Sequence, residues 1–336
     1  MQRLILAGVA VLSGALAVPV SAQNISAAGA TFPAPIYTKW FGEFKAAHPG
    51  IQINYQAIGS GGGIRALTDG TIDFGASDMP MTDEQIGAMK VKPLHFPTVL
   101  GAVVITYNLP GVNAALKFSP DVVASIFLGE IKKWNDPKIA AENPGVKLPG
   151  DEIVVVHRSD GSGTTFVFCD YLSKVSSTWK SKVGANTSVS WPVGVGQPKN
   201  DGVAGLVKQT PGAIGYVELI YAVENKMPYA QLKNAAGKFV TASFDSVTAA
   251  ASNSKDLGPD FRGSITNASG AGSYPISSYT WLLIPSHIPD AAKRKAVTDF
   301  LVWMLGPGQK EAQPLSYAPL PKKIADTEKQ QIARVQ

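Results

Sequence analysis

Stretches with the pattern of a β-strand alternate with stretches with the pattern of an α-helix along most of the chain. The strand-like stretches are short and apolar, whereas the helix-like stretches place apolar side chains three and four positions apart. Repeated strand–helix units build mainly parallel sheets that helices cover on both faces, so we predict an α/β fold. Strands are expected at 51–55, 72–77, 99–107, 153–157, 212–217 and 280–285, and helices at 36–47, 64–67, 164–172, 203–207 and 291–305.

In two regions the sequence indicates secondary structure only weakly or without clear boundaries. A helix capped at Ser119 is expected to run towards Trp134, and residues 227–275 are polar with little periodicity. The chain has 336 residues, of which 45% are hydrophobic. This composition excludes a disordered protein, and the length favours two lobes because single cores stop growing near ~250–300 residues. The net charge is only +5 and the basic residues are scattered, so no nucleic-acid partner is expected.

The N-terminal segment has the pattern of a secretory signal peptide. Arg3 gives it a positive start, residues 4–18 form an apolar run without charge, and Val20-Ser21-Ala22 supplies small residues at the −3 and −1 positions. The apolar run is shorter than the ~20 residues that a membrane-spanning helix needs. No Cys follows it that would carry a lipid anchor. We therefore expect a signal peptide at 1–22, cleaved after Ala22, and a soluble exported protein without direct membrane insertion.

The residue types that support metal or nucleophilic chemistry are few and dispersed. The single Cys169 lies in a helical pattern and is interpreted as a small buried hydrophobe. The four histidines, His48, His95, His157 and His287, show no metal-binding spacing. No P-loop, dinucleotide-binding or nucleophile-elbow motif is complete. We therefore expect no metal, no cofactor and no enzymatic activity.

Three small-residue loops that lead into helices share one chemistry. They lie at 27–33, 59–63 and 160–164, and Arg158 comes just before the third. Each combines hydroxyl donors, glycines that let the backbone approach a ligand, and free N–H groups at a helix N-terminus. Such loops bind anions, although Ser and Thr in any single loop often do no more than cap a helix. Three of them together with Arg158 predict an anion-binding site.

Acidic and amide side chains near these loops have separate interpretations. Asp78 ends the strand at 72–77, where an anion site should not contain a carboxylate unless the ligand carries a proton that it can accept. Asp160 is two residues from Arg158 and is expected to hold its guanidinium in place. The Asn200-Asp201-Gly202 stretch at a helix start is interpreted as structural first.

The same loops resemble the periplasmic phosphate-binding proteins of bacterial high-affinity phosphate ABC transport. The resemblance spans most of the chain after the signal sequence and is weakest at 227–275 and after Leu305. It rests on Ala28-Gly29-Ala30-Thr31-Phe32-Pro33-Ala34-Pro35, Gly59-Ser60-Gly61-Gly62-Gly63, Asp73-Phe74-Gly75-Ala76-Ser77-Asp78, Leu128-Gly129-Glu130-Ile131-Lys132-Lys133-Trp134, Arg158-Ser159-Asp160-Gly161-Ser162-Gly163-Thr164 and Pro211-Gly212-Ala213-Ile214-Gly215-Tyr216-Val217-Glu218.

The resemblance implies a two-lobed periplasmic solute-binding fold, type II-like, with two hinge strands between the lobes. We place these strands at 99–107 and 278–284, lobe I at 23–102 plus 281–336, and lobe II at 103–280. The implied function is a periplasmic, monomeric receptor that binds inorganic phosphate and delivers it to an inner-membrane ABC permease and its ATPase. The implied phosphate contacts are Thr31, Phe32, Ser60, Asp78, Arg158, Ser162, Gly163 and Thr164, with Asp160 behind Arg158.

Two alternatives remain open from the residues themselves. A secreted phosphatase or phosphotransferase built on the same loops would need a nucleophile or metal cluster, against which the dispersed histidines argue. A receptor for sulfate or molybdate would place a fully ionised anion against the Asp78 carboxylate, which would repel it. Arsenate is nearly isosteric with phosphate and also carries a proton, so the sequence does not separate these two ligands.

Overall fold

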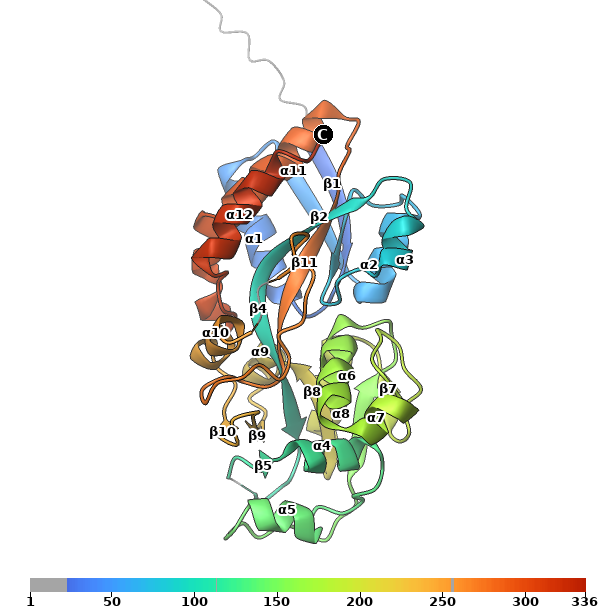
Figure 1. Ribbon diagram of the computed structural model, residues 1–336, viewed down its shortest axis with the longest axis vertical. Coiled ribbons are helices and arrows are strands. Elements are labelled where there is room, and N and C mark those ends of the chain that lie inside the picture. The colour runs from blue at the N-terminus through green and yellow to red at the C-terminus, as the bar shows by residue number, and fades with distance from the viewer. Residues whose placement is uncertain (1–22, 113, 255–256) are drawn as a thin grey trace, which may run out of the picture.

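The computed structural model describes residues 23–112, 114–254 and 257–336, and the expected signal peptide at 1–22 lies outside them. Figure 1 shows two lobes, one above the other, joined by two long strands. The upper lobe, called lobe I below, contains β1 (Gln23–Gly29), α1 (Ala34–Ala47), β2 (Ile51–Ala57), α2 (Ser60–Thr68), β3 (Phe74–Ser77), α3 (Asp83–Gly87), α11 (Ala291–Met304), the 3-10 turns η1 (Pro307–Glu311) and η2 (Gln313–Leu315), and α12 (Lys322–Ile332).

The lower lobe, called lobe II below, is built from the middle of the chain. Its elements are β5 (Lys117–Phe118), α4 (Pro120–Phe127), α5 (Pro137–Glu142), β6 (Val154–Arg158), α6 (Gly163–Val175), α7 (Ser177–Lys182), β7 (Val195–Gln197), α8 (Lys199–Gln209), β8 (Ala213–Glu218), α9 (Leu219–Glu224), β9 (Gln231–Lys233), β10 (Phe239–Val240) and α10 (Phe244–Ser252).

Two strands, β4 (Pro93–Tyr107) and β11 (Ser277–Pro285), join the lobes. They sit at the centre of an eight-stranded sheet with the order β2-β1-β3-β11-β4-β8-β6-β7. Residues 93–102 of β4 pair with β11, whereas residues 103–107 pair with β8 of lobe II. The two-lobed α/β fold is therefore confirmed. The change of partner falls where the lobe boundary was placed, and the boundaries at 102 and 280 stay predictions.

The sheet is mixed, so the expectation of mainly parallel pairing is wrong at its centre. The pairs β1–β2, β1–β3, β6–β7 and β6–β8 are parallel, but β4 and β11 run antiparallel to each of their neighbours. β4 runs from lobe I into lobe II, and β11 runs back from lobe II into lobe I. The two strands that cross between the lobes are therefore antiparallel. All fifteen residues of β4 are buried, as expected for a strand that helices cover on both faces.

Local chemistry explains most helix boundaries. Ser119 caps α4 as predicted, but that helix ends at Phe127 instead of reaching Trp134, because Gly129 adopts a left-handed conformation (φ 74°). The weakly periodic region 227–275 contains β9, β10 and α10, whose Ser243–Ser246 capping box begins the helix. Thr82 and Gln85 form a capping box at the start of α3.

Each lobe has an aromatic core that fixes its shape. In lobe I, α1 buries Tyr37, Trp40 and Phe41, and the Phe41 ring centroid lies 5.1 Å from that of Phe300 on α11. In lobe II, Phe168 of α6 stacks on Tyr216 of β8 with ring centroids 4.5 Å apart. Because both cores are well filled, the loops between the lobes are held on rigid supports.

Candidate functional site

The three anion-type loops meet where the two lobes face each other. The parallel strands β1 and β3 end at this junction from lobe I, and β6 ends there from lobe II. Ligands of open α/β sheets bind at such carboxyl ends of strands. The lobes touch directly, since the Gly61 N–H donates to the Gly161 carbonyl oxygen at 2.8 Å. The structure is thus a closed arrangement of the two lobes.

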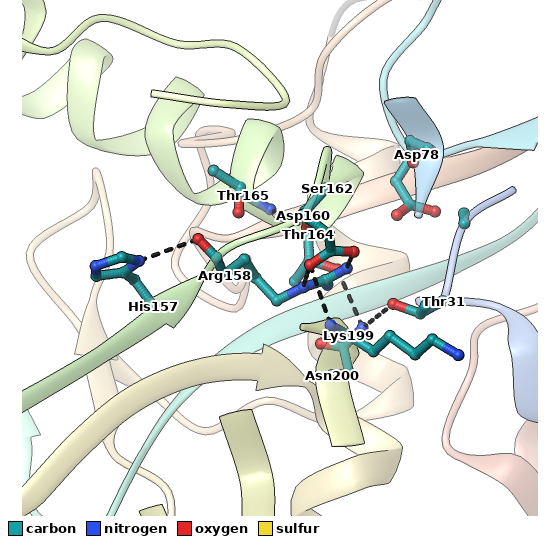
Figure 2. A network of polar contacts seen from close by, with 12 residues as sticks. Thr31, Asp78, His157, Arg158, Asp160, Ser162, Thr164, Thr165, Lys199 and Asn200 are labelled. Carbon is teal, nitrogen blue, oxygen red and sulfur yellow. Dashed lines mark hydrogen bonds and ion pairs between the residues drawn. The ribbon is translucent and has the colours of Figure 1, made fainter. Parts of the chain in front are cut away.

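The predicted site residues all lie at this junction and are withdrawn from solvent. Thr31 and Phe32 precede α1, Ser60 starts α2 and Asp78 follows β3; Arg158 ends β6, and Ser162, Gly163 and Thr164 begin α6. The exposed fraction of Thr31, Phe32, Ser60, Asp78, Arg158, Ser162 and Thr164 is 3% or less. Figure 2 shows Thr31 and Asp78 on one side and the lobe II side chains on the other.

The Arg158 guanidinium is the cation of the site, and Asp160 fixes its orientation. Arg158 Nε donates to Asp160 Oδ1 at 2.7 Å, and a second guanidinium nitrogen donates to Oδ2 at 2.5 Å. Although burial opposes it, hydrogen bonding to Arg158 lowers the pKa of Asp160 below its usual value. A further guanidinium nitrogen, Nη1, lies 3.4 Å from Thr164 Oγ1. Asp160 therefore holds the guanidinium flat, with one edge directed towards the start of α6.

The first turn of α6 supplies backbone donors. Ser162 caps this helix, since its Oγ accepts from the Thr165 N–H at 3.0 Å. Gly163 leaves no room for a side chain, because a β-carbon there would lie 2.6 Å from Asp78 Oδ2. The helix N-terminus of lobe II therefore approaches the carboxylate of lobe I as closely as a backbone can.

Asp78 is the acceptor among these donors, and half of its carboxylate is unused. Thr280 Oγ1 donates to Asp78 Oδ1 at 2.8 Å, whereas Oδ2 is buried without a hydrogen-bond partner in the described part of the chain. Burial raises the pKa of the Asp78 carboxyl to about 7, and the Thr280 hydrogen bond and the Arg158 charge oppose this rise only partly. A buried polar oxygen of this kind costs free energy unless a partner fills it. The site thus offers hydrogen-bond donors on most sides, and Asp78 Oδ2 can accept a hydrogen bond from a protonated ligand.

Hydroxyl groups from both lobes hold the peptide units of the first loop. Tyr221 of α9 donates to the Thr31 carbonyl oxygen at 2.6 Å, and Tyr317 donates to the Phe32 carbonyl oxygen at 2.6 Å. Tyr216 of β8 receives the Arg158 N–H at 3.1 Å and lies 2.6 Å from Thr165 Oγ1. These three tyrosines give the loops of both lobes a fixed backbone position.

The structure adds residues that were not assigned to the site from the sequence. Asn200 was interpreted as structural, but its side chain is buried at the junction and hydrogen-bonds both Thr31 and Thr164. Thr280, on the crossing strand β11, lies in none of the anion-type loops. The sequence does carry a signal for Asn200, because it lies in a helix start rich in Asn, Asp and Gly. The role of Thr280 depends on its tertiary contact with Asp78 alone.

Other candidate groups lie in structural surroundings. His157 stacks on Trp191, His95 is buried and accepts the Met81 N–H, and His48 stacks on Phe44. Burial lowers the pKa of His95 to about 4. Cys169 is buried and free, so its interpretation as a core residue is confirmed. The described residues contain no group of three or more His, Cys, Asp or Glu side chains placed to hold a metal ion.

No helix within residues 23–112, 114–254 and 257–336 combines the length and the apolar character needed to cross a bilayer. The described site, by contrast, has a clear chemical character. A guanidinium, several hydroxyls and two helix N-termini surround one carboxyl of raised pKa. This arrangement suits a small oxyanion that still carries a proton.

A family model described as a PBP superfamily domain matches residues 17–307. The phosphate-binding protein PstS of Xylella fastidiosa is 49% identical over 303 residues, which cover 90% of this chain and 82% of that protein. PstS of Pasteurella multocida is 46% identical, with 94% of this chain and 91% of that protein covered. The phosphate-bound structure of the periplasmic phosphate-binding protein PfluDING superposes with a TM-score of 0.74 at 21% identity, covering 92% and 93% of the two chains.

Proposed function

Because the chain belongs to the PstS phosphate-binding proteins of the PBP superfamily, we propose that it is a receptor that captures inorganic phosphate between its two lobes. It delivers the phosphate to an ABC permease of the inner membrane that an ATPase drives. The function follows from the near-complete coverage of the chain by relatives of that name, together with the chemistry of the closed junction.

The observation that carries this proposal is the unpaired Asp78 Oδ2. It is buried within a set of donors and faces the first turn of α6. Near neutral pH phosphate carries at least one proton, and one proton between Asp78 and a phosphate oxygen satisfies both groups. Sulfate brings no proton, so a carboxylate lone pair would face an anionic oxygen. Sites that hydrogen-bond a specific group reject analogues that lack it by up to ~10⁴–10⁵.

The residues that hold the phosphate are those that the loops contribute from both lobes. Arg158 supplies a charge-assisted contact, and Asp78 accepts or shares the phosphate proton. The remaining contacts are backbone N–H groups and hydroxyls of Thr31, Phe32, Ser60, Ser162, Gly163 and Thr164. Asp160 acts through Arg158 and does not touch the anion. Arsenate, which also carries a proton, is accepted by the same arrangement.

The protein acts as a receptor and not as a secreted phosphatase. The histidines that would serve as bases are engaged elsewhere, since His157 stacks on Trp191 and His95 accepts a backbone N–H. PstS of Xylella fastidiosa and PstS of Pasteurella multocida are both named as binding proteins.

The place of action is the periplasm. The segment 1–22 has the pattern of a signal peptide, and cleavage after Ala22 releases the described protein as a monomer. It needs neither a cofactor nor a metal.

A calorimetric titration tests this proposal. Residues 23–336 are unfolded, dialysed to remove bound anion, refolded, and titrated with phosphate and separately with sulfate at pH 8. Binding of one phosphate per chain, without measurable heat from sulfate, is expected. Equal binding of both anions, or no phosphate binding by a correctly folded protein, would contradict the proposed function.

A further inference from the structure

The Asn200 side chain connects the two threonines that flank the site. Asn200 lies at the start of α8 and is fully buried. Its amide nitrogen Nδ2 is 2.9 Å from Thr31 Oγ1 of lobe I and 3.2 Å from Thr164 Oγ1 of lobe II. Figure 2 shows the amide between these two side chains. One NH₂ group thus bridges hydroxyls from opposite lobes.

The orientation of this amide is fixed by the backbone. Asn200 Oδ1 accepts the Glu218 N–H at 3.1 Å. A backbone N–H only donates, so the amide oxygen must face Glu218 and the NH₂ must face the threonines. The amide cannot be reversed without leaving the buried Glu218 N–H unpaired.

The fixed amide determines what each hydroxyl has left to offer. A hydroxyl that accepts from an N–H keeps its own hydrogen for another partner. Thr164 Oγ1 accepts from Asn200 and from Arg158 Nη1, which uses both of its lone pairs and leaves only its hydrogen. Thr31 Oγ1 likewise receives an Asn200 hydrogen and keeps its own. Both hydroxyls are therefore set to donate.

We propose that Asn200 is a positioning residue that turns the Thr31 and Thr164 hydroxyls into obligatory donors towards the bound anion. This inference rests on the proposed function of the same site and adds the reason why its hydroxyls favour an anion. An oxyanion oxygen accepts and, apart from the one protonated position, does not donate. Because Asn200 makes both hydroxyls donate to the anion, the Asp78 carboxylate is left to accept the hydrogen bond from the protonated ligand oxygen.

The Thr31–Asn200 contact also belongs to the closed arrangement, because it joins side chains of different lobes. The Thr31 hydroxyl is held by Asn200 only when lobe II has approached lobe I. Closure and the alignment of this donor consequently occur together.

The substitution Asn200→Asp tests the inference. It keeps an oxygen for the Glu218 N–H but replaces the NH₂ donor with a second acceptor. The threonine hydroxyls would then donate to the carboxylate that replaces the amide, so their lone pairs, instead of their hydrogens, would face the phosphate. We expect phosphate affinity to fall by about 100-fold or more, as when one partner of a buried charged contact is lost.

A double-mutant cycle separates this effect from the added charge. In a Thr164→Val background the hydroxyl that Asn200 positions is gone, so Asn200→Asp should cost at least about tenfold less than in the wild type. The same comparison is made with Thr31→Val. Equal losses in all backgrounds would show that only the charge acts and would overturn the positioning role.

Two controls keep the outcome interpretable. Asn143 is also a buried asparagine whose amide bonds backbone groups, but it lies away from the junction. Asn143→Asp should lower thermal stability and leave the phosphate affinity of the folded protein unchanged. Wild-type protein that fails to bind phosphate in the same assay would contradict the proposed function, whereas a binding wild type with an additive cycle contradicts the role of Asn200 alone.

Discussion

Gly163 of lobe II lies so close to Ser60 of lobe I that a β-carbon on Gly163 would be 2.3 Å from Ser60 Oγ. The two residues belong to helix N-termini that face each other across the junction, α6 and α2. No side chain fits between them in the closed arrangement. The absence of a side chain at Gly163 is therefore a condition for closure.

Gly163→Ala tests this condition. The added methyl group must push the lobes apart, and overpacking of this kind costs about 1–3 kcal/mol, so phosphate affinity should fall about 5- to 150-fold. Gly205→Ala is the matched control, because a β-carbon on Gly205 of α8 meets nothing within 4 Å. Calorimetric affinities of both variants are compared with the wild type. Unchanged affinity in Gly163→Ala would mean that binding does not need this approach.

Arg158→Ala should remove the main cationic contact with the anion. Its guanidinium is buried, and loss of one partner of a buried charged contact costs ~2–5 kcal/mol of binding free energy. Arg262→Ala is a close control, because Arg262 pairs with Asp260 two residues away, just as Arg158 pairs with Asp160. Equilibrium dialysis with labelled phosphate measures both. If Arg158→Ala binds within a few-fold of the wild type, the site lies elsewhere.

The affinity for sulfate should depend on pH through Asp78. Burial raises the pKa of this carboxyl to about 7, so below that pH the carboxyl carries the proton that sulfate lacks. Sulfate binding should therefore be strongest in acid and weaken about tenfold per pH unit above pH 7. Asp78→Asn should remove this slope and weaken phosphate binding less than Asp78→Ala does. Titrations with sulfate from pH 5 to 9 measure the slope, and a flat profile in the wild type would contradict it.

Glu328 of α12 should lower stability at neutral pH. Its side chain is fully buried, and both carboxylate oxygens lack a hydrogen-bond partner in the described part of the chain. Burial raises the pKa of Glu328 well above its usual value. The folded state therefore holds this proton more tightly than the unfolded state, and stability is lost as pH rises above the unfolded value.

Glu328→Met should accordingly stabilise the protein by about 1–3 kcal/mol at pH 8, and by less at pH 5. Glu224→Met, at an exposed position at the end of α9, should change the free energy of unfolding by no more than about 0.5 kcal/mol. Urea unfolding at the two pH values gives these free energies. A Glu328→Met variant that is less stable than the wild type at pH 8 would show that the carboxylate has a partner in solution.

The sequence predicts those features that arise from local patterns. The helix cap at Ser119 needs only neighbouring residues, and it is present. The loops at 59–63 and 160–164 follow β2 and β6, which were predicted, and ligands of such sheets bind where strands end; β1, which precedes the loop at 27–33, was not predicted.

Contacts between distant parts of the chain leave no such pattern. Asn200 meets Thr31 across 169 residues, and Thr280 meets Asp78 across 202 residues. The start of β4 was missed because Pro93 and Pro97 argue against a strand. These prolines are tolerated because Pro93 begins the strand and Pro97 lies beside a shift in the register with β11. The antiparallel centre of the sheet likewise follows from how the lobes connect.

The central claim is that the junction selects phosphate through the Asp78 carboxylate. Competition between unlabelled sulfate and labelled phosphate on the wild-type protein at pH 8 tests it most directly. We predict that even an excess of sulfate of about 1,000-fold leaves the phosphate bound. Displacement of phosphate by sulfate at comparable concentration would contradict both the role of Asp78 and the assignment of phosphate as the ligand.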